Sequence, residues 1–264
     1  MADNWQEFEV FDNPAVLNFI FYPRPDDYRP ADTDGSKGYM VPVGEGIDIS
    51  CRFYFGDAAN ANLLFFHGNG ELASEYGDIG IAFNNIGLNL FVADYRGYGG
   101  SGGRPSVSGM MRDAHAIAGW FQQFLNDKEY TGSRFIMGRS LGSGPAIELA
   151  SAYPHDFRGM VIESGFCDVK DLLGRMGRIL QQPGQTVPPS PGFDRVVKIT
   201  MPALVIHGQY DSIVPLGEGE KIFRNVASAD KKMVIIPGAD HNTIFAEGME
   251  LYLHELGDFV QKYK

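Results

Sequence analysis

The sequence predicts a single α/β domain built on a mainly parallel sheet, with an antiparallel hairpin before it and helices on both faces. Three observations support this fold class. From about residue 60 onward, short runs of consecutive apolar residues alternate with longer segments of helical periodicity. The 264 residues are enough to bury a large core without disulfides or a structural metal. Many of the 33 glycines follow the apolar runs, where a parallel sheet needs tight turns.

The individual elements follow from these patterns. Residues 38–43 and 47–55, around Gly44-Glu45-Gly46, predict the antiparallel hairpin. Strands that are covered on both faces have consecutive apolar residues, and six such runs occur, at residues 63–66, 89–93, 134–137, 159–162, 203–206 and 233–236. Helices are predicted where apolar residues recur at helical spacing, at residues 72–86, 107–125, 143–152 and 247–262. This alternation predicts right-handed crossovers between parallel strands.

Residues 165–200 interrupt the alternation, because a plain crossover between the fourth and fifth strands is shorter. The segment combines a helical stretch with a loop rich in proline and glycine over residues 183–192. We predict that it forms a small lid over one end of the sheet. No internal repeat or strong linker divides the chain, so residues 1–264 are expected to form one domain.

Composition and charge exclude several classes of function. The chain has 22 basic and 33 acidic residues, a net charge of −11, which disfavours binding to nucleic acid or to an anionic membrane. Cys51 and Cys167 are too few for a disulfide framework, and we expect two buried thiols rather than one bridge. The acidic N-terminus does not resemble a signal peptide, and no apolar run is long enough for a membrane helix. A cytoplasmic protein is therefore expected.

Two segments have the pattern Gly-x-Ser-x-Gly, and their surroundings distinguish them. Ser140, in residues 138–142, directly follows a predicted strand and precedes a predicted helix, whereas Ser101 lies in a glycine-rich loop with no helix after it. A nucleophilic serine needs the strand–turn–helix context, because the turn is too tight for side chains at its flanks. We predict Ser140 as the nucleophile and the backbone N–H of Leu141, at the helix N-terminus, as one donor to an oxyanion.

An activated serine needs a histidine and a carboxylate, expected after it in the order Ser, Asp or Glu, His. Four histidines follow Ser140: His155, His207, His241 and His254. We predict His241 as the base, because it lies in the loop after the last strand, where active sites of parallel sheets form; a solvated loop histidine is the alternative. We predict Asp211 as the carboxylate, with capping of the helix near Pro215 as its alternative role. Asp240 is adjacent to His241 in the chain, and neighbouring side chains rarely converge.

A second oxyanion donor is expected in the turn after the first parallel strand, His67-Gly68-Asn69-Gly70. The predicted donor is the N–H of Asn69, and Gly70 is the neighbouring alternative. His67 is expected to form hydrogen bonds within the loop rather than to act in catalysis. Asp94 and Arg96 follow the next strand. The sequence is compatible either with a structural role for them or with a position at the border of the site.

Taken together, these segments resemble the α/β-hydrolase superfamily of serine hydrolases. The resemblance covers nearly the whole chain and rests on residues 64–70, 94–99, 138–142 and 204–211, which occur in family order. Residues 19–24 are similar to one subgroup, which includes relatives of acyl-protein thioesterases and depalmitoylases and uncharacterised bacterial hydrolases. The resemblance implies the α/β-hydrolase fold and a triad of Ser140, Asp211 and His241. Membrane-acting members of the subgroup usually carry an N-terminal anchor or a cysteine-rich tail, which is not seen here, so lipidated membrane proteins are not expected substrates.

The predicted function is hydrolysis of a carboxylic ester or thioester with a small or medium acyl group, through an acyl-enzyme. Apolar residues of the lid are expected to line the acyl pocket together with Leu72, Phe166, Ile213 and Val214. No metal or organic cofactor is expected. The expected partner is the small acyl substrate, and the sequence leaves the oligomeric state open. A peptidase or amidase on the same fold and a non-catalytic binding protein that retains the fold are the alternatives.

Overall fold

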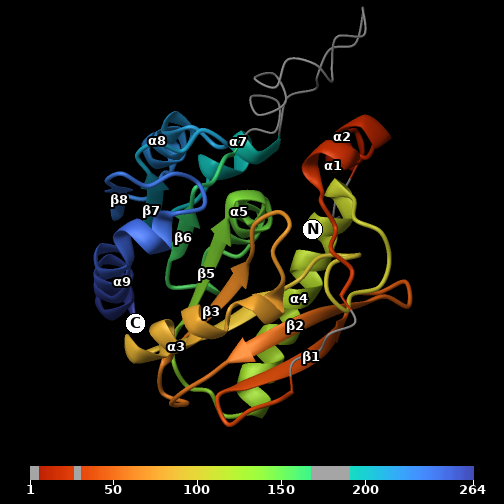
Figure 1. The fold of residues 1–264 in the computed structure, drawn as a ribbon, viewed down its shortest axis with the longest axis horizontal. Helices are drawn as coiled ribbons and strands as arrows, with labels where there is room; N and C mark the ends of the chain where they lie inside the picture. Colours follow the sequence, from red (N-terminus) through yellow and green to blue (C-terminus); the bar gives the residue numbers. More distant parts are fainter. Residues whose placement is uncertain (1–5, 27–30, 168–190) are drawn as a thin grey trace, which may run out of the picture.

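The computed structural model describes residues 6–26, 31–167 and 191–264. In this part of the chain eight strands form one sheet, in the order β1-β2-β4-β3-β5-β6-β7-β8 (Figure 1). The strands are β1 Ser36–Pro42, β2 Asp48–Tyr54, β3 Ala61–Phe66, β4 Leu88–Ala93, β5 Arg134–Arg139, β6 Met160–Glu163, β7 Ala203–Gly208 and β8 Lys231–Ile236. β2 is antiparallel to both its neighbours, and the other strands are parallel. The predicted parallel sheet with an N-terminal antiparallel hairpin is confirmed.

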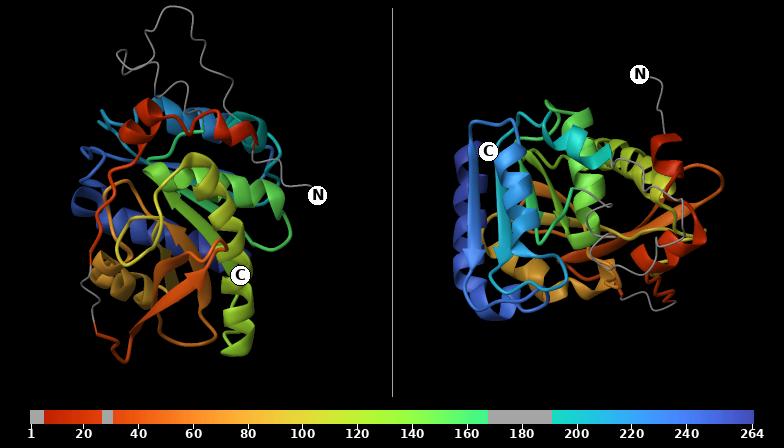
Figure 2. Two further views of the ribbon diagram at one scale, coloured as in Figure 1. Left: turned by 90° about the vertical axis from the view of Figure 1, so that its right-hand side faces the viewer. Right: turned by 90° about the horizontal axis from the view of Figure 1, so that it is seen from above.

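Helices cover both faces of the sheet, as predicted. The described helical segments are α1 Gln6–Glu9, α2 Pro14–Ile20, η1 Ala73–Glu75, α3 Gly77–Asn85, α4 Val107–Asp127, η2 Ser140–Gly142, α5 Ser143–Ala152, α7 Pro191–Val196, α8 Leu216–Asn225 and α9 Ile244–Tyr263. α4 and α5 pack on one face, and α3 and α9 pack on the other (Figure 2). Each face therefore has its own apolar core. The sequence patterns did not predict α1 and α2.

The inner strands are buried because helices cover them on both sides. Every residue of β3 and of β4 is buried, which explains why their apolar residues are consecutive. β8 differs because it lies at the edge of the sheet, where Ile235 is 41% exposed. The prediction of cover on both faces is therefore wrong for β8.

The helix predicted over residues 72–86 is divided in two. η1 and α3 meet at Tyr76, whose φ of −89° and ψ of 18° are not helical. The Tyr76 side chain turns inward, and its ring packs against Phe65 with 5.1 Å between centroids. Packing against the strand therefore outweighs the continuous helical periodicity of this segment.

The predicted lid lies largely outside the described residues. Of residues 165–200, the structure describes 165–167 and 191–200. The described portion includes α7, in which Val196 is fully buried. The lid and the single-domain organisation of the chain stay predictions.

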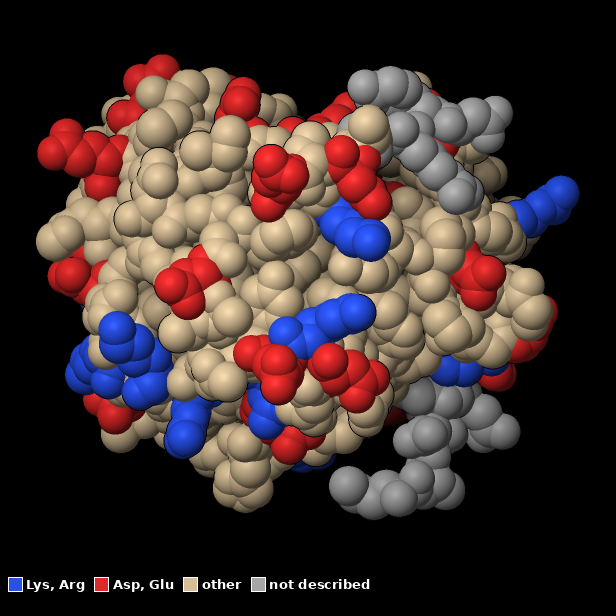
Figure 3. Space-filling view, turned by 90° about the horizontal axis from the view of Figure 1, so that it is seen from below, with Lys and Arg blue, Asp and Glu red and all other residues tan. Residues whose placement is uncertain are grey.

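Cys51 and Cys167 are both buried and form no disulfide with each other, as expected. Across the described ranges, no helix has the length and apolar character needed to cross a membrane. On the face seen from below, acidic and basic side chains both occur and lie interspersed (Figure 3). The acidic residues on that face therefore do not form a patch separate from the basic ones.

Candidate active site

Ser140 lies in the tight turn between β5 and α5. Its φ is +50°, in the left-handed region that non-glycine residues rarely adopt. A Cβ atom at Gly138 would lie 2.1 Å from the carbonyl oxygen of Gly142, and one at Gly142 would lie 1.9 Å from that of Phe66. Both flanking positions therefore require glycine, because backbone atoms occupy the space that a side chain needs. The strained serine and its two glycines form one tightly packed unit.

The structure brings the three predicted triad residues together. Nε2 of His241 lies 3.0 Å from Oγ of Ser140, and Nδ1 of His241 lies 2.7 Å from Oδ2 of Asp211. The side chains come from turns that follow β5, β7 and β8, at the carboxyl edge of the parallel strands. Ser140, His241 and Asp211 are all buried, at 8%, 7% and 5% exposure. Burial strengthens the hydrogen bonds among them, since little water competes.

The carboxylate of Asp211 has a second set of partners. Its Oδ1 accepts hydrogen bonds from the backbone N–H groups of Ile213, at 3.0 Å, and Val214, at 2.7 Å. Burial acts to raise the pKa of Asp211, but the hydrogen bond and charge of His241, together with the Val214 amide, lower it below its usual value. Asp211 therefore orders the turn before α8 and also contacts His241, but it does not cap α8, whose N-cap residue is Pro215 and which has no side-chain cap.

The other histidines that follow Ser140 lie apart from it or are otherwise engaged. His207 is fully buried, and its Nε2 lies 2.8 Å from the carbonyl oxygen of Val214. His155 is exposed, and the side chain of His254 on α9 is 66% exposed. Among these side chains, only that of His241 is hydrogen-bonded to Ser140 in the described structure.

The remaining alternatives have structural roles. Oδ1 of Asp240 accepts hydrogen bonds from the backbone N–H groups of Asn242 and Thr243, so it organises the turn before α9. Oγ of Ser101 accepts a hydrogen bond of 2.9 Å from the backbone N–H of Ser50. Ser101 therefore ties its glycine-rich loop to β2.

The turn after β3 is held by its own side chains. Oδ1 of Asn69 accepts hydrogen bonds from the backbone N–H of Tyr22, at 2.8 Å, and from the hydroxyl of Tyr98, at 2.7 Å. The next residue, Gly70, has a φ of +77°, which glycine adopts without strain. Two distant segments of the chain thus fix the position of Asn69.

His67 lies beneath this turn, and each of its ring nitrogens faces an oxygen atom. Its Nδ1 lies 2.8 Å from the carbonyl oxygen of Gly68, and its Nε2 lies 3.0 Å from Oδ1 of Asp94. Both partners are acceptors, so both ring nitrogens carry protons. Burial opposes the positive charge, but the hydrogen bond and charge of Asp94 raise the pKa of His67 above its usual value. Asp94 therefore has a structural role, and His67 bonds within the loop as predicted.

Arg96 also has structural partners. Its guanidinium donates two hydrogen bonds to Asp113, at 2.7 and 2.8 Å, and one to Glu45, at 2.9 Å. The bidentate geometry is the strong form of this interaction. The contacts join the loop after β4 to α4 and to the β1–β2 hairpin.

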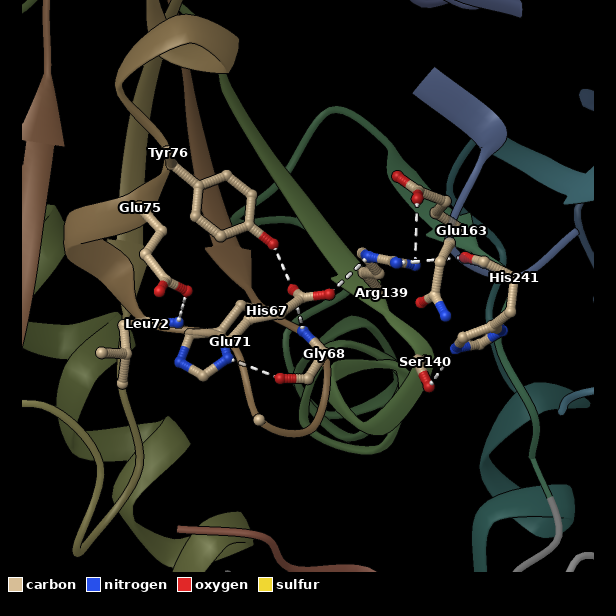
Figure 4. Close-up of polar contacts among 12 residues, drawn as sticks. His67, Gly68, Glu71, Leu72, Glu75, Tyr76, Arg139, Ser140, Glu163 and His241 are labelled. Carbon is tan, nitrogen blue, oxygen red and sulfur yellow. Dashed lines mark hydrogen bonds and ion pairs between the residues drawn. The ribbon is translucent and has the colours of Figure 1, made fainter. Parts of the chain in front are cut away.

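The sequence analysis missed a buried ionic cluster beside Ser140 (Figure 4). Nε of Arg139 donates to Oε1 of Glu71 at 2.8 Å, and its Nη1 lies 3.3 Å from Oε1 of Glu163. Its Nη2 donates to the backbone carbonyl oxygen of His241 at 3.1 Å. Although burial opposes its charge, Glu163 and Glu71 raise the pKa of Arg139 further. The available signal was a charged residue at the carboxyl end of a strand whose interior is uncharged, which occurs at both Arg139 and Glu163.

The predicted pocket residues do not all lie together. Phe166 lines an apolar pocket with Met111, Gly144 and Ile147, beside the first turns of α5. Leu72 and Val214 are buried, Ile213 is 55% exposed, and none of these three lines that pocket. The charged residues Glu148 and Arg195 line it as well, and they form an ion pair with each other.

Comparisons with known proteins agree with this architecture. The family model described as serine aminopeptidase, S33, matches residues 57–190 and 193–247. The human alpha/beta hydrolase domain-containing protein 17B is 28% identical over 242 residues, 89% of this chain and 78% of the relative. An uncharacterised protein of Mycobacterium tuberculosis is 30% identical over 218 residues, 78% of this chain and 75% of the relative. The structure of the Pyrococcus furiosus esterase Pf2001 superposes with a TM-score of 0.73 at 18% identity, covering 92% of this chain and 98% of that one.

Proposed function

Because this chain belongs to the serine aminopeptidase S33 family, within the α/β-hydrolase superfamily, we propose that it is a serine hydrolase whose nucleophile is Ser140. The observation that carries the proposal is the continuous path from Oγ of Ser140 through the His241 ring to Asp211. The strained turn at Ser140 supports it, because left-handed non-glycine residues cluster at functional sites.

The geometry supports a defined role for each member of the triad. Nδ1–H of His241 donates to Asp211, which leaves the lone pair of Nε2 to accept the proton of the Ser140 hydroxyl. Asp211 remains ionised, because its pKa is lowered, and it stabilises the imidazolium that forms when Ser140 attacks an acyl carbonyl carbon. His241 then returns the proton to the leaving group, and water completes deacylation by the same route.

The negative charge of the tetrahedral intermediate needs donors that are already in place. We assign this role to the backbone N–H groups of Asn69 and Leu141. The turn that carries Asn69 is anchored by Tyr22 and Tyr98, and Leu141 lies directly after the nucleophile in η2, which leads into α5. Donors on such fixed backbone cost no reorganisation at the moment of reaction.

The proposed substrate is a carboxylic ester or thioester with a small or medium acyl group. The apolar pocket at Phe166 supports this class, because it adjoins the first turns of α5. Oγ of Ser143 connects the pocket wall to the nucleophile, since it donates to the carbonyl oxygen of Ser140 at 2.6 Å and accepts from the N–H of Phe166 at 3.2 Å. The acyl chain would lie in this pocket, which Met111 also lines.

A peptidase is a second candidate, since the description of the family names an aminopeptidase. Recognition of a free amino terminus needs a negatively charged partner near the nucleophile. Glu71 and Glu163, the carboxylates that contact the residue before Ser140, both face Arg139. This pairing favours ester over aminopeptide substrates.

The experiment that tests the proposal measures turnover of p-nitrophenyl esters and acyl thioesters of increasing chain length, beside a panel of aminoacyl p-nitroanilides. We expect turnover of short and medium acyl esters by the wild type and its loss in Ser140→Ala. A preference for the anilides would favour the peptidase. Unchanged ester turnover in Ser140→Ala would contradict the mechanism.

A further inference from the structure

Arg139 occupies an unusual place for a charged residue. It ends β5, directly before Ser140, and its side chain is only 13% exposed. Its three nitrogen atoms reach three different segments of the chain: Glu71 after β3, Glu163 at the end of β6, and the backbone of His241 after β8 (Figure 4). A single side chain therefore links the segments that surround the nucleophile.

The first contact reaches the turn that carries Asn69. Oε1 of Glu71 accepts from Arg139, and its Oε2 accepts from the backbone N–H of Gly68 at 2.8 Å and from the hydroxyl of Tyr76. A Cβ atom at Gly68 would lie 2.7 Å from Oε1 of Glu71, so the carboxylate packs directly against this turn. Gly68 shares a peptide unit with Asn69, whose N–H is the proposed oxyanion donor. Glu71 holds the N–H of Gly68, which lies in the preceding peptide unit, so it fixes the residue from which the Asn69 peptide starts.

The second contact reaches the proposed base. Nη2 of Arg139 donates to the backbone carbonyl oxygen of His241 at 3.1 Å. This bond holds the backbone of His241, whereas Asp211 holds its ring. The position of the imidazole relative to Ser140 thus depends on both Arg139 and Asp211.

The third contact keeps the guanidinium in place. Glu163 faces Nη1 of Arg139 at 3.3 Å, and its Oε2 accepts a hydrogen bond of 2.7 Å from the hydroxyl of Tyr252 on α9. Burial of charges costs several kcal/mol for each ion unless good partners compensate. A buried cluster of one guanidinium and two carboxylates therefore need not increase the stability of the fold. Its contacts instead indicate that it fixes the positions of the segments around Ser140.

We propose that Arg139 is a positioning residue, which sets the distance and orientation of the Asn69 peptide and of His241 relative to Ser140. The inference rests on the proposed function. It assigns a task to the residue between Gly138 and Ser140 that no feature of the Gly-x-Ser-x-Gly pattern requires. The hydrogen bonds and ion pairs of Arg139 go to Glu71, Glu163 and the backbone of His241 rather than to the reacting atoms, so it acts through these residues.

The test compares ester hydrolysis by the wild type and Arg139→Ala. Misplacement of reacting groups by about 1 Å costs about 10²-fold in rate, so we expect kcat to fall by about 10²-fold while KM changes little. Added guanidinium chloride at millimolar concentration is expected to restore part of kcat in Arg139→Ala, because the ion can occupy the vacated site. A residue needed only for stability would not give this rescue.

A double mutant separates coupling from general damage. Glu71→Gln keeps an oxygen for the N–H of Gly68 but loses the charge that holds Arg139. If the two residues act as one unit, Arg139→Ala combined with Glu71→Gln loses little more kcat than Arg139→Ala alone. Effects that multiply would overturn the proposed linkage to the oxyanion turn.

Arg52→Ala is the matched control. Arg52 is also a buried arginine, at 6% exposure, but its guanidinium donates to the carbonyl oxygen of Ala31 and to Oγ of Ser36 on the hairpin side. We expect Arg52→Ala to lower the unfolding temperature without lowering kcat, and added guanidinium to leave its kcat unchanged.

If the wild type is active and folded Arg139→Ala has the same kcat, the inference about Arg139 is overturned and the proposed function stands. A wild type that neither hydrolyses esters nor reacts with a fluorophosphonate would overturn the proposed function and the inference with it.

Discussion

Nε2 of His241 lies 3.0 Å from Oγ of Ser140, although the two residues are 101 positions apart in the chain. The two residues follow β5 and β8, which are separated in the sheet by β6 and β7. The parallel arrangement makes this meeting feasible, because the carboxyl ends of β5 to β8 lie at the same edge and long loops reach across it. The order and direction of the strands therefore bring Ser140 and His241 together. The role of each residue in catalysis can be tested by substituting it.

The first prediction concerns the carboxylate that holds His241. Asp211→Asn removes the negative charge and favours the wrong tautomer of the ring, so kcat is expected to fall by about 10⁴-fold. Asp240→Asn is the matched control, because Asp240 is exposed and its carboxylate accepts hydrogen bonds from backbone N–H groups of the turn before α9. Steady-state ester hydrolysis by both variants checks this, and equal losses in the two would contradict the assignment of Asp211.

The second prediction concerns the pH dependence of stability. The raised pKa of His67 means that the folded state binds more protons than the unfolded state, so stability falls as the pH rises. This stabilisation is fully present below about pH 6.5, the ordinary histidine pKa, and is lost as the pH rises through the higher pKa of the folded state. In Asp94→Asn, the amide oxygen can still accept from the N–H of Ala73, but the ion pair is gone.

Thermal unfolding of the wild type and Asp94→Asn across this pH range checks the second prediction. The difference between their unfolding temperatures is expected to be largest at low pH and to shrink as the pH rises. A difference that stays constant would show that the charge of His67 does not contribute.

The third prediction concerns the glycine after the nucleophile. A Cβ atom at Gly142 would lie 1.9 Å from the carbonyl oxygen of Phe66, so Gly142→Ala forces backbone apart and is expected to cost about 1–3 kcal/mol of stability. kcat is expected to fall as well, since Ser140 moves. Gly119→Ala is the control, because nothing lies within 4 Å of the added atom on the exposed face of α4, and it is expected to stabilise by about 0.5–1 kcal/mol. Denaturant unfolding of both variants measures the contrast.

The fourth prediction concerns the acyl pocket. Met111 and Phe166 both line the apolar pocket beside α5, and Met111→Trp is expected to fill part of that space. We expect medium-chain esters to lose turnover while the acetyl ester, which does not reach the pocket, keeps it. The acetyl ester thereby serves as the internal control for folding. A parallel loss across all chain lengths would place the acyl group elsewhere.

Several elements were predictable because their sequence patterns are local. β3 and β4 are consecutive apolar runs, since helices cover both their faces. Ser140 was identifiable because the strand, the tight turn and the helix are contiguous in the chain. The boundary at Tyr76 was not predictable, because it depends on packing against Phe65 from another element.

The cluster at Arg139 shows where sequence patterns give no information. Glu71 precedes Arg139 by 68 residues, and the carbonyl oxygen of His241 follows it by 102. No periodicity encodes such ion pairs, which exist only after the sheet has aligned its strand ends. The same reason explains why the predicted pocket residues do not lie together. Leu72 and Val214 are apolar because they pack in the interior. From sequence alone, an apolar residue of the core cannot be distinguished from one that lines a pocket.

Covalent labelling with a fluorophosphonate, followed by intact-mass measurement and peptide mapping, tests the central claim most directly. The reagent reacts with a serine only where a base activates it and an oxyanion site stabilises the product. We predict one adduct per wild-type chain, located on Ser140, and none on Ser140→Ala. Absence of labelling in the wild type at high protein and reagent concentration, or an adduct on Ser101 or another serine, would contradict it.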